Sequence, residues 1–136
     1  KQAEDQPEGP IGSIINLSST TASHTQPELM GYSIASAALN QMTRSMALAL
    51  APHRIRVNAV AFGSVMSASL KASVAENREW RDDIRNHTPL GRIASPSELV
   101  DAIQFLAAES SSFMTGEIMV VDGGRSLLDA VSAPAH

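Results

Sequence analysis

The chain has 136 residues, 43% of them hydrophobic and 18% charged, which is typical of one globular domain with a hydrophobic core. Its formal net charge of −4 is spread along the sequence, which argues against a protein that binds nucleic acid or a membrane surface. The absence of cysteine excludes disulfides and thiolate metal sites, and no membrane-length apolar run or secretory signal is present, so we expect a cytoplasmic protein.

Two apolar runs and a helix between them dominate the first half of the chain. After a polar opening segment, residues 11–17 (IGSIINL) predict a strand that is buried on both faces. Residues 18–31 are rich in Ser, Thr and Pro and predict a loop. From 31 to 51 apolar residues recur at three- and four-residue spacing, which predicts a long helix that ends before Pro52. Residues 55–62 (IRVNAVAF) predict a second buried strand.

The second half alternates patterned and variable segments. Residues 63–95 predict a loop, a polar helix and a further loop. Residues 95–108 open with Ser-Pro-Ser-Glu, a capping pattern, and predict a helix. Residues 117–121 (EIMVV) predict a third strand, and residues 125–136 predict a flexible tail.

This order of elements predicts an α/β fold. Strands that alternate with helices favour a parallel sheet with right-handed crossovers and helices on its faces. In such sheets ligands bind beyond the carboxyl ends of the strands. Those ends are the loops that follow Leu17, Phe62 and Val121.

A series of short motifs runs through the chain. GSIINLSS ends at Ser19, Tyr32 follows thirteen residues later, and IRVNAV occupies residues 55–60. The later members are Gly63, Pro89-Leu90-Gly91-Arg92, Pro96-x-Glu98, Phe105-Leu106-Ala107, Thr115-Gly116 and Val121-Asp122-Gly123-Gly124. In this order and at these spacings, the series resembles the short-chain dehydrogenase/reductase family from its fifth strand to its end, most closely the 3-oxoacyl-carrier-protein reductases and glucose dehydrogenases. The resemblance implies the C-terminal half of a Rossmann-type doubly wound parallel sheet.

The resemblance implies a chemical role for five positions. Ser19 matches the serine that hydrogen-bonds the substrate oxygen, and Tyr32 matches the tyrosine that exchanges a proton with that oxygen while hydride moves to or from the nicotinamide. Gly63, Val65 and Ser67 match the loop that touches the nicotinamide amide, with Ser67 where a threonine is usual. The implied cofactor is NAD or NADP. The implied partners are a small-molecule alcohol or carbonyl substrate and further copies of the chain, in a dimer or tetramer.

One catalytic position departs from the family pattern. The motif Tyr-x-x-x-Lys is replaced by Tyr32-Ser33-Ile34-Ala35-Ser36, so Ser36 occupies the lysine position. In the family, that lysine holds the cofactor ribose and lowers the tyrosine pKa. Bringing a free tyrosine from a pKa near 10 to about 7 requires about 4 kcal/mol, which a neutral serine cannot supply. Lys71 lies in the segment 63–95, which matches the substrate lid, and nothing in the sequence fixes it near Tyr32.

Taken singly, several of these residues have simpler interpretations. Ser19 alone is typical of a serine that caps a turn, and Tyr32 alone of a tyrosine at a helix start with its hydroxyl bonded to backbone. Their spacing within the full series favours site positions instead. Asn58 and Asp122 favour structural roles, and Trp80 is typical of a lid anchor. The remaining candidates are interpreted as turn glycines, Gly116, Gly123 and Gly124, and as surface histidines without metal-ligand spacing, His24, His53, His87 and His136.

The family's first half has no counterpart in this sequence. No segment resembles its Gly-rich turn, its ribose-binding acidic residue or its Asn-Asn-Ala-Gly motif, and Phe62 stands where a proline is usual. The first residue is Lys1 rather than methionine, so we expect that it is not a natural start. The strand from Ile11 would leave an unpaired apolar edge. We therefore expect a longer parent chain, a partner chain that completes the sheet, or a dimer that buries the edge.

Three functions stay open. The leading hypothesis is an NAD(P)-dependent oxidoreductase that interconverts an alcohol and a ketone or aldehyde, with this chain alone not competent because of Ser36 and the missing half. The alternative is a non-catalytic family member that acts as an oligomerisation or scaffold partner. The third is a binding module for a small apolar ligand. The sequence does not select the substrate, because the lid is its least patterned segment. It does not select NAD over NADP, because the residues that discriminate between them belong to the family's first half.

Overall fold

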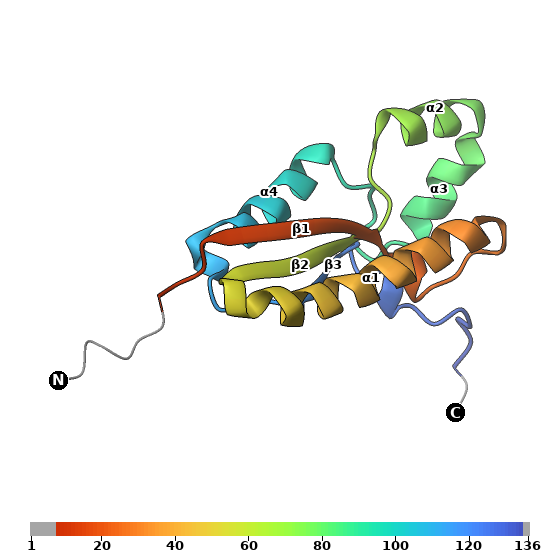
Figure 1. Cartoon of the computed structure of the whole chain (residues 1–136). Coiled ribbons are helices and arrows are strands. Elements are labelled where there is room, and N and C mark those ends of the chain that lie inside the picture. Colours follow the sequence, from red (N-terminus) through yellow and green to blue (C-terminus); the bar gives the residue numbers. More distant parts are fainter. Residues whose placement is uncertain (1–7, 135–136) are drawn as a thin grey trace.

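The computed structural model describes residues 8–134 and contains one sheet of three parallel strands in the order β1–β2–β3 (Figure 1). The strands are β1 (Gly12–Ser19), β2 (Ile55–Phe62) and β3 (Ile118–Val121). The helices are α1 (Met30–Leu50), α2 (Ala68–Glu76), α3 (Arg78–Asn86) and α4 (Pro96–Ala107). The predicted α/β fold with a parallel sheet is confirmed. Within the described residues, no helix combines the length and the apolar character needed to cross a membrane.

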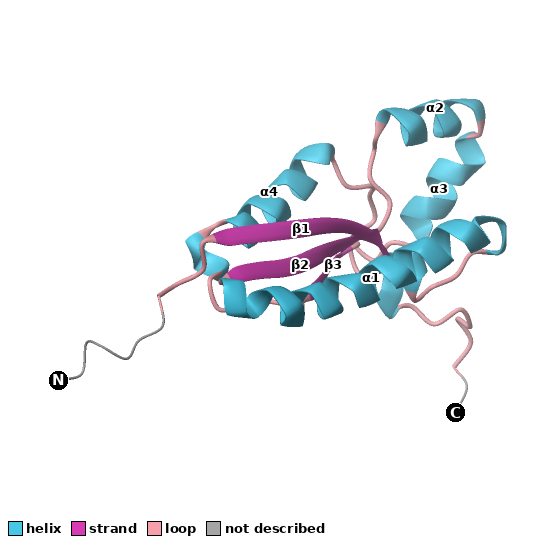
Figure 2. Cartoon of the chain, in the orientation of Figure 1, coloured by secondary structure: helices cyan, strands magenta, loops and turns pink. Residues whose placement is uncertain are grey.

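The helices α1 and α4 cover opposite faces of the sheet (Figure 2). On one face, Ser13 Oγ donates a 2.9 Å hydrogen bond to the carbonyl of Leu106 in α4. On the other, Asn16 Nδ2 donates a 3.0 Å hydrogen bond to Thr43 Oγ1 in α1. Successive residues of a strand point to opposite faces, so Ser13 and Asn16, three positions apart, are directed to different sides.

The two crossovers therefore have opposite hands. Both join neighbouring parallel strands and step across the sheet in the same direction, from β1 to β2 through α1 and from β2 to β3 through α4. Helices on opposite faces make one of these connections left-handed, so the prediction of right-handed crossovers throughout is wrong. The rule describes a strand that feeds directly into its crossover helix. The second connection first leaves the sheet through α2 and α3 before α4 returns to it (Figure 1).

The hydrophobic core lies between the sheet and α4. Val60, Phe62 and Leu106 are buried together, and Leu106 is fully enclosed. Partly buried apolar side chains pack around them, namely Ile15, Val65, Leu99, Ala102, Ile103, Met114, Met119 and Val121. On the α1 face the buried apolar side chains are no larger than valine, with Ala47 on the helix and Val57, Ala59 and Ala61 on β2. Small residues let α1 approach the sheet closely.

Two polar side chains of β2 hold the segment between α4 and β3. Asn58 is fully buried, donates from Nδ2 to the carbonyl of Met114 at 3.0 Å and accepts from the Glu117 N–H at 3.0 Å. Arg56 donates to the carbonyls of Leu106 at 2.9 Å and Met114 at 3.2 Å. These bonds satisfy backbone groups that the end of a helix leaves unpaired. The structural role predicted for Asn58 is confirmed.

Several boundaries differ from those predicted. β1 continues through Ser19, and the following segment, predicted as a loop, contains two short 3₁₀ turns. The variable region contains two helices rather than one, because Asn77 takes a non-helical conformation (φ −129°, ψ 85°) and ends α2 just before α3 begins. The segment after Gly124 opens with a 3₁₀ turn, Arg125–Leu127.

The outer edge of β1 is open. Within residues 8–134, β1 pairs with β2 alone, and no other strand lies on its far side. Ile11 and Leu17 at the two ends of this strand region are largely exposed. The unpaired apolar edge predicted for this strand is therefore present in the described residues.

Helix α4 begins at a capping box, as the Ser-Pro-Ser-Glu pattern predicts. The Ser95 N–H donates to Glu98 Oε2 at 2.8 Å, and Arg92 donates two hydrogen bonds to the same carboxylate, at 2.6 and 2.8 Å. The Arg92 hydrogen bond, followed by that from the Ser95 backbone, lowers the pKa of Glu98 to about 2. The first turn of α4 is thus linked to the segment that precedes it.

We expect this link to persist until strongly acidic pH. The folded-state pKa of about 2 lies below the ordinary value of 4.5, so the carboxylate stabilises the fold fully above pH 4.5 and loses this effect as the pH falls through about 2. An NMR titration of the Glu98 carboxyl should have its midpoint near 2. Arg92→Gln should raise that midpoint, whereas Arg54→Gln, at a separate ion pair, should not. A midpoint at the ordinary glutamate value in the unaltered chain would contradict the pairing.

Candidate active site

A hollow of about 880 Å³ opens at the carboxyl end of the sheet. Its walls come from the end of β1, the start of α1, the loop after β2, the helices α2 and α3, and the turn after β3. Parallel strands end at one edge of a sheet, and this edge is where the sequence places the ligand-binding loops. We call this cavity the Ser19–Tyr32 hollow, after two of its lining residues.

Ser19 and Tyr32 both line this hollow, although they belong to different elements. Ser19 is buried at the end of β1, and its Oγ accepts hydrogen bonds from the Thr21 N–H at 3.2 Å and the Thr21 hydroxyl at 2.9 Å. Because Ser19 Oγ accepts both bonds, its own proton stays free to donate. Tyr32, in the first turn of α1, is 56% exposed. Within residues 8–134 its hydroxyl makes no hydrogen bond, so the backbone-bonded interpretation does not hold.

Ser36 lies one turn beyond Tyr32 but does not line the hollow. It is buried against β1, where Ser18 Oγ donates to the Ser36 carbonyl at 3.4 Å. Lys71 lines a different cavity, as the sequence analysis expected of a residue with nothing to fix it near Tyr32. No lysine among the described residues takes the place of the family lysine at this hollow.

Two basic residues that the sequence analysis did not select do line the hollow. Arg125, in the turn after β3, donates to Ser64 Oγ at 2.9 Å. His24 lies on the loop that follows β1 and is exposed. Both loops follow the carboxyl ends of strands, and that position is the sequence signal by which these two residues could have been found. The exposed positions of His53 and His87 agree with the predicted surface histidines, while His136 lies outside the described residues.

Gly63 is held against the end of β3. Its N–H donates to the Val121 carbonyl at 3.1 Å, and a Cβ at this position would lie 2.8 Å from Asp122 Cβ. The close approach of two strand ends therefore requires glycine here. Gly63 also lines the Ser19–Tyr32 hollow, unlike the other two residues predicted to bind the cofactor, Val65 and Ser67.

Asp122 closes the turn that follows β3. Its carboxylate accepts from the Gly124 N–H at 2.9 Å and the Ser126 N–H at 2.7 Å. Burial raises the pKa of Asp122, but the hydrogen bonds from Ser126 and Gly124 outweigh it and hold that pKa below its ordinary value. Gly123 and Gly124 take φ of +64° and +87°, a region that favours glycine. The structural role predicted for Asp122 and the turn role predicted for these glycines are confirmed.

The loop after Gly63 contains backbone donors without a partner among the described residues, and the Val65 N–H is one of them. Val65 forms a parallel bridge with Ala94, in which Met66 N–H donates to the Ala94 carbonyl at 2.9 Å. In such a bridge the Val65 N–H points away from Ala94, and within the described residues it donates no hydrogen bond. Ser67 caps α2, because its Oγ accepts from the Leu70 N–H at 3.2 Å. A backbone N–H without a partner can donate a hydrogen bond to an amide oxygen of a ligand.

No group of three or more histidine, aspartate or glutamate residues within 8–134 is arranged to hold a metal ion.

A family model described as enoyl-(acyl carrier protein) reductase matches residues 2–126. A short-chain dehydrogenase from Penicillium roqueforti (strain FM164) is 37% identical over 116 residues, which cover 85% of this chain and 42% of that protein. The chain belongs to the short-chain dehydrogenase/reductase family. The resemblance stated from the motif series is confirmed.

Solved members of the short-chain dehydrogenase/reductase family share this fold. The ligand-free aldohexose dehydrogenase from Thermoplasma acidophilum gives a TM-score of 0.83 at 30% identity, over 90% of this chain and 51% of that one. An NADPH-bound short-chain oxidoreductase from Pseudomonas aeruginosa PAO1, with an atypical catalytic centre, gives 0.76 at 34% identity, over 88% of this chain and 47% of that one. The cofactor of this short-chain dehydrogenase/reductase family is NAD or NADP. The chain spans about half of the length of these relatives. Its three strands correspond to the C-terminal half of the Rossmann-type sheet in these proteins.

Proposed function

We propose that the protein containing these residues is an NAD(P)-dependent oxidoreductase that interconverts an alcohol and a ketone or aldehyde. The observation that carries this proposal is the shared hollow at the carboxyl end of the sheet, which both Ser19 and Tyr32 line. Neither residue is adjacent to the other in sequence, and both have a hydroxyl proton available for a ligand oxygen.

The two hydroxyls have different tasks in this proposal. The free proton of Ser19 donates a hydrogen bond to the substrate oxygen and orients it. The Tyr32 phenol gives its proton to the same oxygen during carbonyl reduction and takes one back during alcohol oxidation, as general acid and base. The nicotinamide cofactor supplies or accepts the hydride.

The loop after β2 would hold the nicotinamide end of the cofactor. The Val65 N–H is a donor without a partner among the described residues, and it suits the nicotinamide amide oxygen. Gly63 keeps the loop against β3, because a side chain there would strike Asp122. Ser67 fixes the start of α2 and thereby links the cofactor loop to the lid.

Helices α2 and α3 form the lid over the substrate. Leu70 of α2 and Trp80 and Ile84 of α3 line the Ser19–Tyr32 hollow. Apolar side chains at this position exclude water and strengthen hydrogen bonds to the reacting oxygen. Trp80 is 55% exposed in this arrangement, so closure of the lid onto a substrate would bury it further.

Ser36 makes the proposed reaction slow at neutral pH, because no lysine charge assists proton transfer. The test uses the full-length protein, carbonyl substrates and the absorbance of NADH or NADPH. Ser36→Lys should raise turnover at pH 7 by about tenfold or more, which corresponds to at least about 1.4 kcal/mol. Ser45→Lys, at an exposed position of the same helix, is the matched control and should change nothing. The proposal fails if the full-length protein binds no nicotinamide and the lysine variant reduces no carbonyl compound.

The open edge of β1 supports a second candidate, a non-catalytic oligomerisation partner. Besides that edge, Met30, Ile34 and Leu48 expose large apolar side chains along α1. Exposed apolar surface of this kind favours association with another chain, including a second copy of this one. Light scattering tests this candidate, which predicts a mass of at least twice 14.4 kDa. A monomer at micromolar concentration would overturn it.

A further inference from the structure

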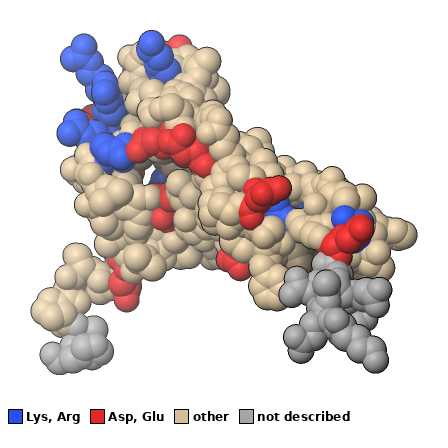
Figure 3. Space-filling model, turned by 90° about the vertical axis from the view of Figure 1, so that its left-hand side faces the viewer, with Lys and Arg blue, Asp and Glu red and all other residues tan. Residues whose placement is uncertain are grey.

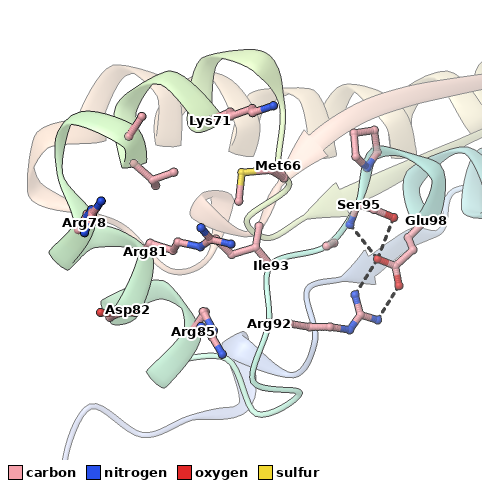
Figure 4. Close-up of a pocket in the computed structure, with 14 residues that line it drawn as sticks. Met66, Lys71, Arg78, Arg81, Asp82, Arg85, Arg92, Ile93, Ser95 and Glu98 are labelled. Atoms are coloured by element: carbon pink, nitrogen blue, oxygen red, sulfur yellow. Dashed lines mark hydrogen bonds and ion pairs between the residues drawn. The ribbon is translucent and has the colours of Figure 1, made fainter.

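A second hollow, of about 1440 Å³, lies between the lid helices and the start of α4 (Figure 4). It shares no lining residue with the Ser19–Tyr32 hollow. Five of the ten Lys and Arg residues of the chain line it, namely Lys71, Arg78, Arg81, Arg85 and Arg92. Figure 3 shows basic side chains gathered at one end of the molecule. We call this cavity the basic hollow.

The positive charge of the basic hollow is only partly balanced. Two carboxylates, Asp82 and Glu98, line the same cavity, and Glu98 is already paired with Arg92. Among the described residues, no ion pair includes Lys71 or the three arginines of α3, which are Arg78, Arg81 and Arg85. Four cations therefore face one unpaired carboxylate, in a chain whose formal net charge is −4.

The three arginines of α3 share one face of that helix. Arg78, Arg81 and Arg85 are separated by three and four residues, the spacing of neighbours on a helix surface. Figure 4 shows Arg81 extending from α3 towards Ile93 across the cavity. Trp80 and Ile84, on another face of α3, line the Ser19–Tyr32 hollow instead. Asp82 is the one carboxylate of α3 that lines the same cavity, so the three arginines keep an excess of positive charge on this face.

We propose that the basic hollow binds a phosphoryl group of a small-molecule ligand. Guanidinium groups match phosphate oxygens with paired hydrogen bonds, and several of them favour a multiply charged anion over a single carboxylate. Ser95 and Pro96 at the N-terminus of α4 line the same cavity, and Arg92 already neutralises the Glu98 carboxylate that caps this helix. The volume admits a molecule of the size of a phosphorylated sugar or a nucleotide.

The experiment uses Trp80, the one tryptophan of the chain, as its probe. It lies on α3 beside Arg81, so an anion bound in the basic hollow should change its fluorescence. Titration of the 136-residue chain with inorganic pyrophosphate should give a saturable signal, confirmed by calorimetry. Acetate at equal ionic strength should give none. The double variant Arg81→Gln, Arg85→Gln should bind pyrophosphate at least about tenfold more weakly, about 1.4 kcal/mol.

Matched variants separate this site from a general effect of charge. Arg44→Gln, at an exposed position of α1, removes charge outside the hollow and should leave the affinity unchanged. Tyr32→Phe should also leave it unchanged, so a failure of the oxidoreductase proposal does not affect this result. Circular dichroism confirms that the variants are folded. The proposal is overturned by a signal that does not saturate, or by equal affinities in the double variant and Arg44→Gln.

Competition identifies the source of the phosphoryl group. Glycerol 3-phosphate represents a phosphorylated substrate, and NADP represents the cofactor. Displacement of pyrophosphate by glycerol 3-phosphate assigns the hollow to the substrate, and displacement by NADP alone assigns it to the cofactor. Displacement by neither overturns the proposal of a ligand site.

Discussion

Tyr32→Phe is expected to lower kcat for carbonyl reduction by the full-length protein by about 10²- to 10⁴-fold. The phenol is the proposed proton donor at the Ser19–Tyr32 hollow, and phenylalanine keeps the ring but removes the proton. Within residues 8–134 the Tyr32 hydroxyl has no hydrogen-bond partner, and the side chain is half exposed. The substitution should therefore change the free energy of unfolding by no more than about 0.5 kcal/mol.

The decisive measurement for Tyr32→Phe is a loss of kcat without a change in cofactor binding. KM for the cofactor should stay within about twofold, because the affected group is a proton donor rather than a binding contact. If turnover of the unaltered protein is too slow to measure, Tyr32→Phe is made in the Ser36→Lys variant and compared with Ser36→Lys alone. A kcat within threefold of the parent would remove Tyr32 from the reaction. If kcat and the free energy of unfolding both fall substantially, the role of Tyr32 is structural.

Leu106→Ala is expected to lower the free energy of unfolding by about 3–5 kcal/mol. Leu106 is fully buried on α4 and packs against Val60 and Phe62, so alanine would leave a cavity in the main core. The carbonyl of the same residue accepts hydrogen bonds from Ser13 and Arg56, which join the helix to two strands. The cavity therefore lies where α4, β1 and β2 are connected. Urea unfolding followed by circular dichroism measures the change.

Leu48→Ala is the matched control for this prediction. Leu48 is also a helical leucine, but it lies on α1 and is 80% exposed. Its replacement should change stability by no more than about 0.5 kcal/mol. A loss below 1 kcal/mol for Leu106→Ala would mean that the described packing does not hold α4. A large loss for Leu48→Ala would instead indicate that α1 is covered by another chain.

Local chemistry explains what the sequence predicted correctly. The strands β1 and β2 follow from continuous apolar runs. Helix α4 begins at Pro96 because Ser95 and Glu98 of the Ser-Pro-Ser-Glu pattern form a capping box at its first turn. The assignment of Tyr32 as a site residue stays a prediction, and it depends on the resemblance of the motif series to the short-chain dehydrogenase/reductase family. Only the structure places both residues on one hollow, because Ser19 ends a strand and Tyr32 begins a helix across an irregular segment.

Other features depend on contacts that periodicity does not encode. The apolar stripe of α4 indicates that the helix packs on the sheet, but it does not indicate which face of the sheet the helix covers. The opposite hands of the two crossovers were therefore not predicted. Gly63 was predicted as a cofactor-binding residue. The structure shows that Asp122, which follows β3 and is distant in sequence, leaves no room for a side chain at this position. The arginines of α3 recur at helical spacing in the sequence. The basic hollow that they line exists only because α2 and the start of α4 form its other walls. Residues close in sequence fix local structure through short-range bonds, whereas shared cavities arise from the packing of distant segments.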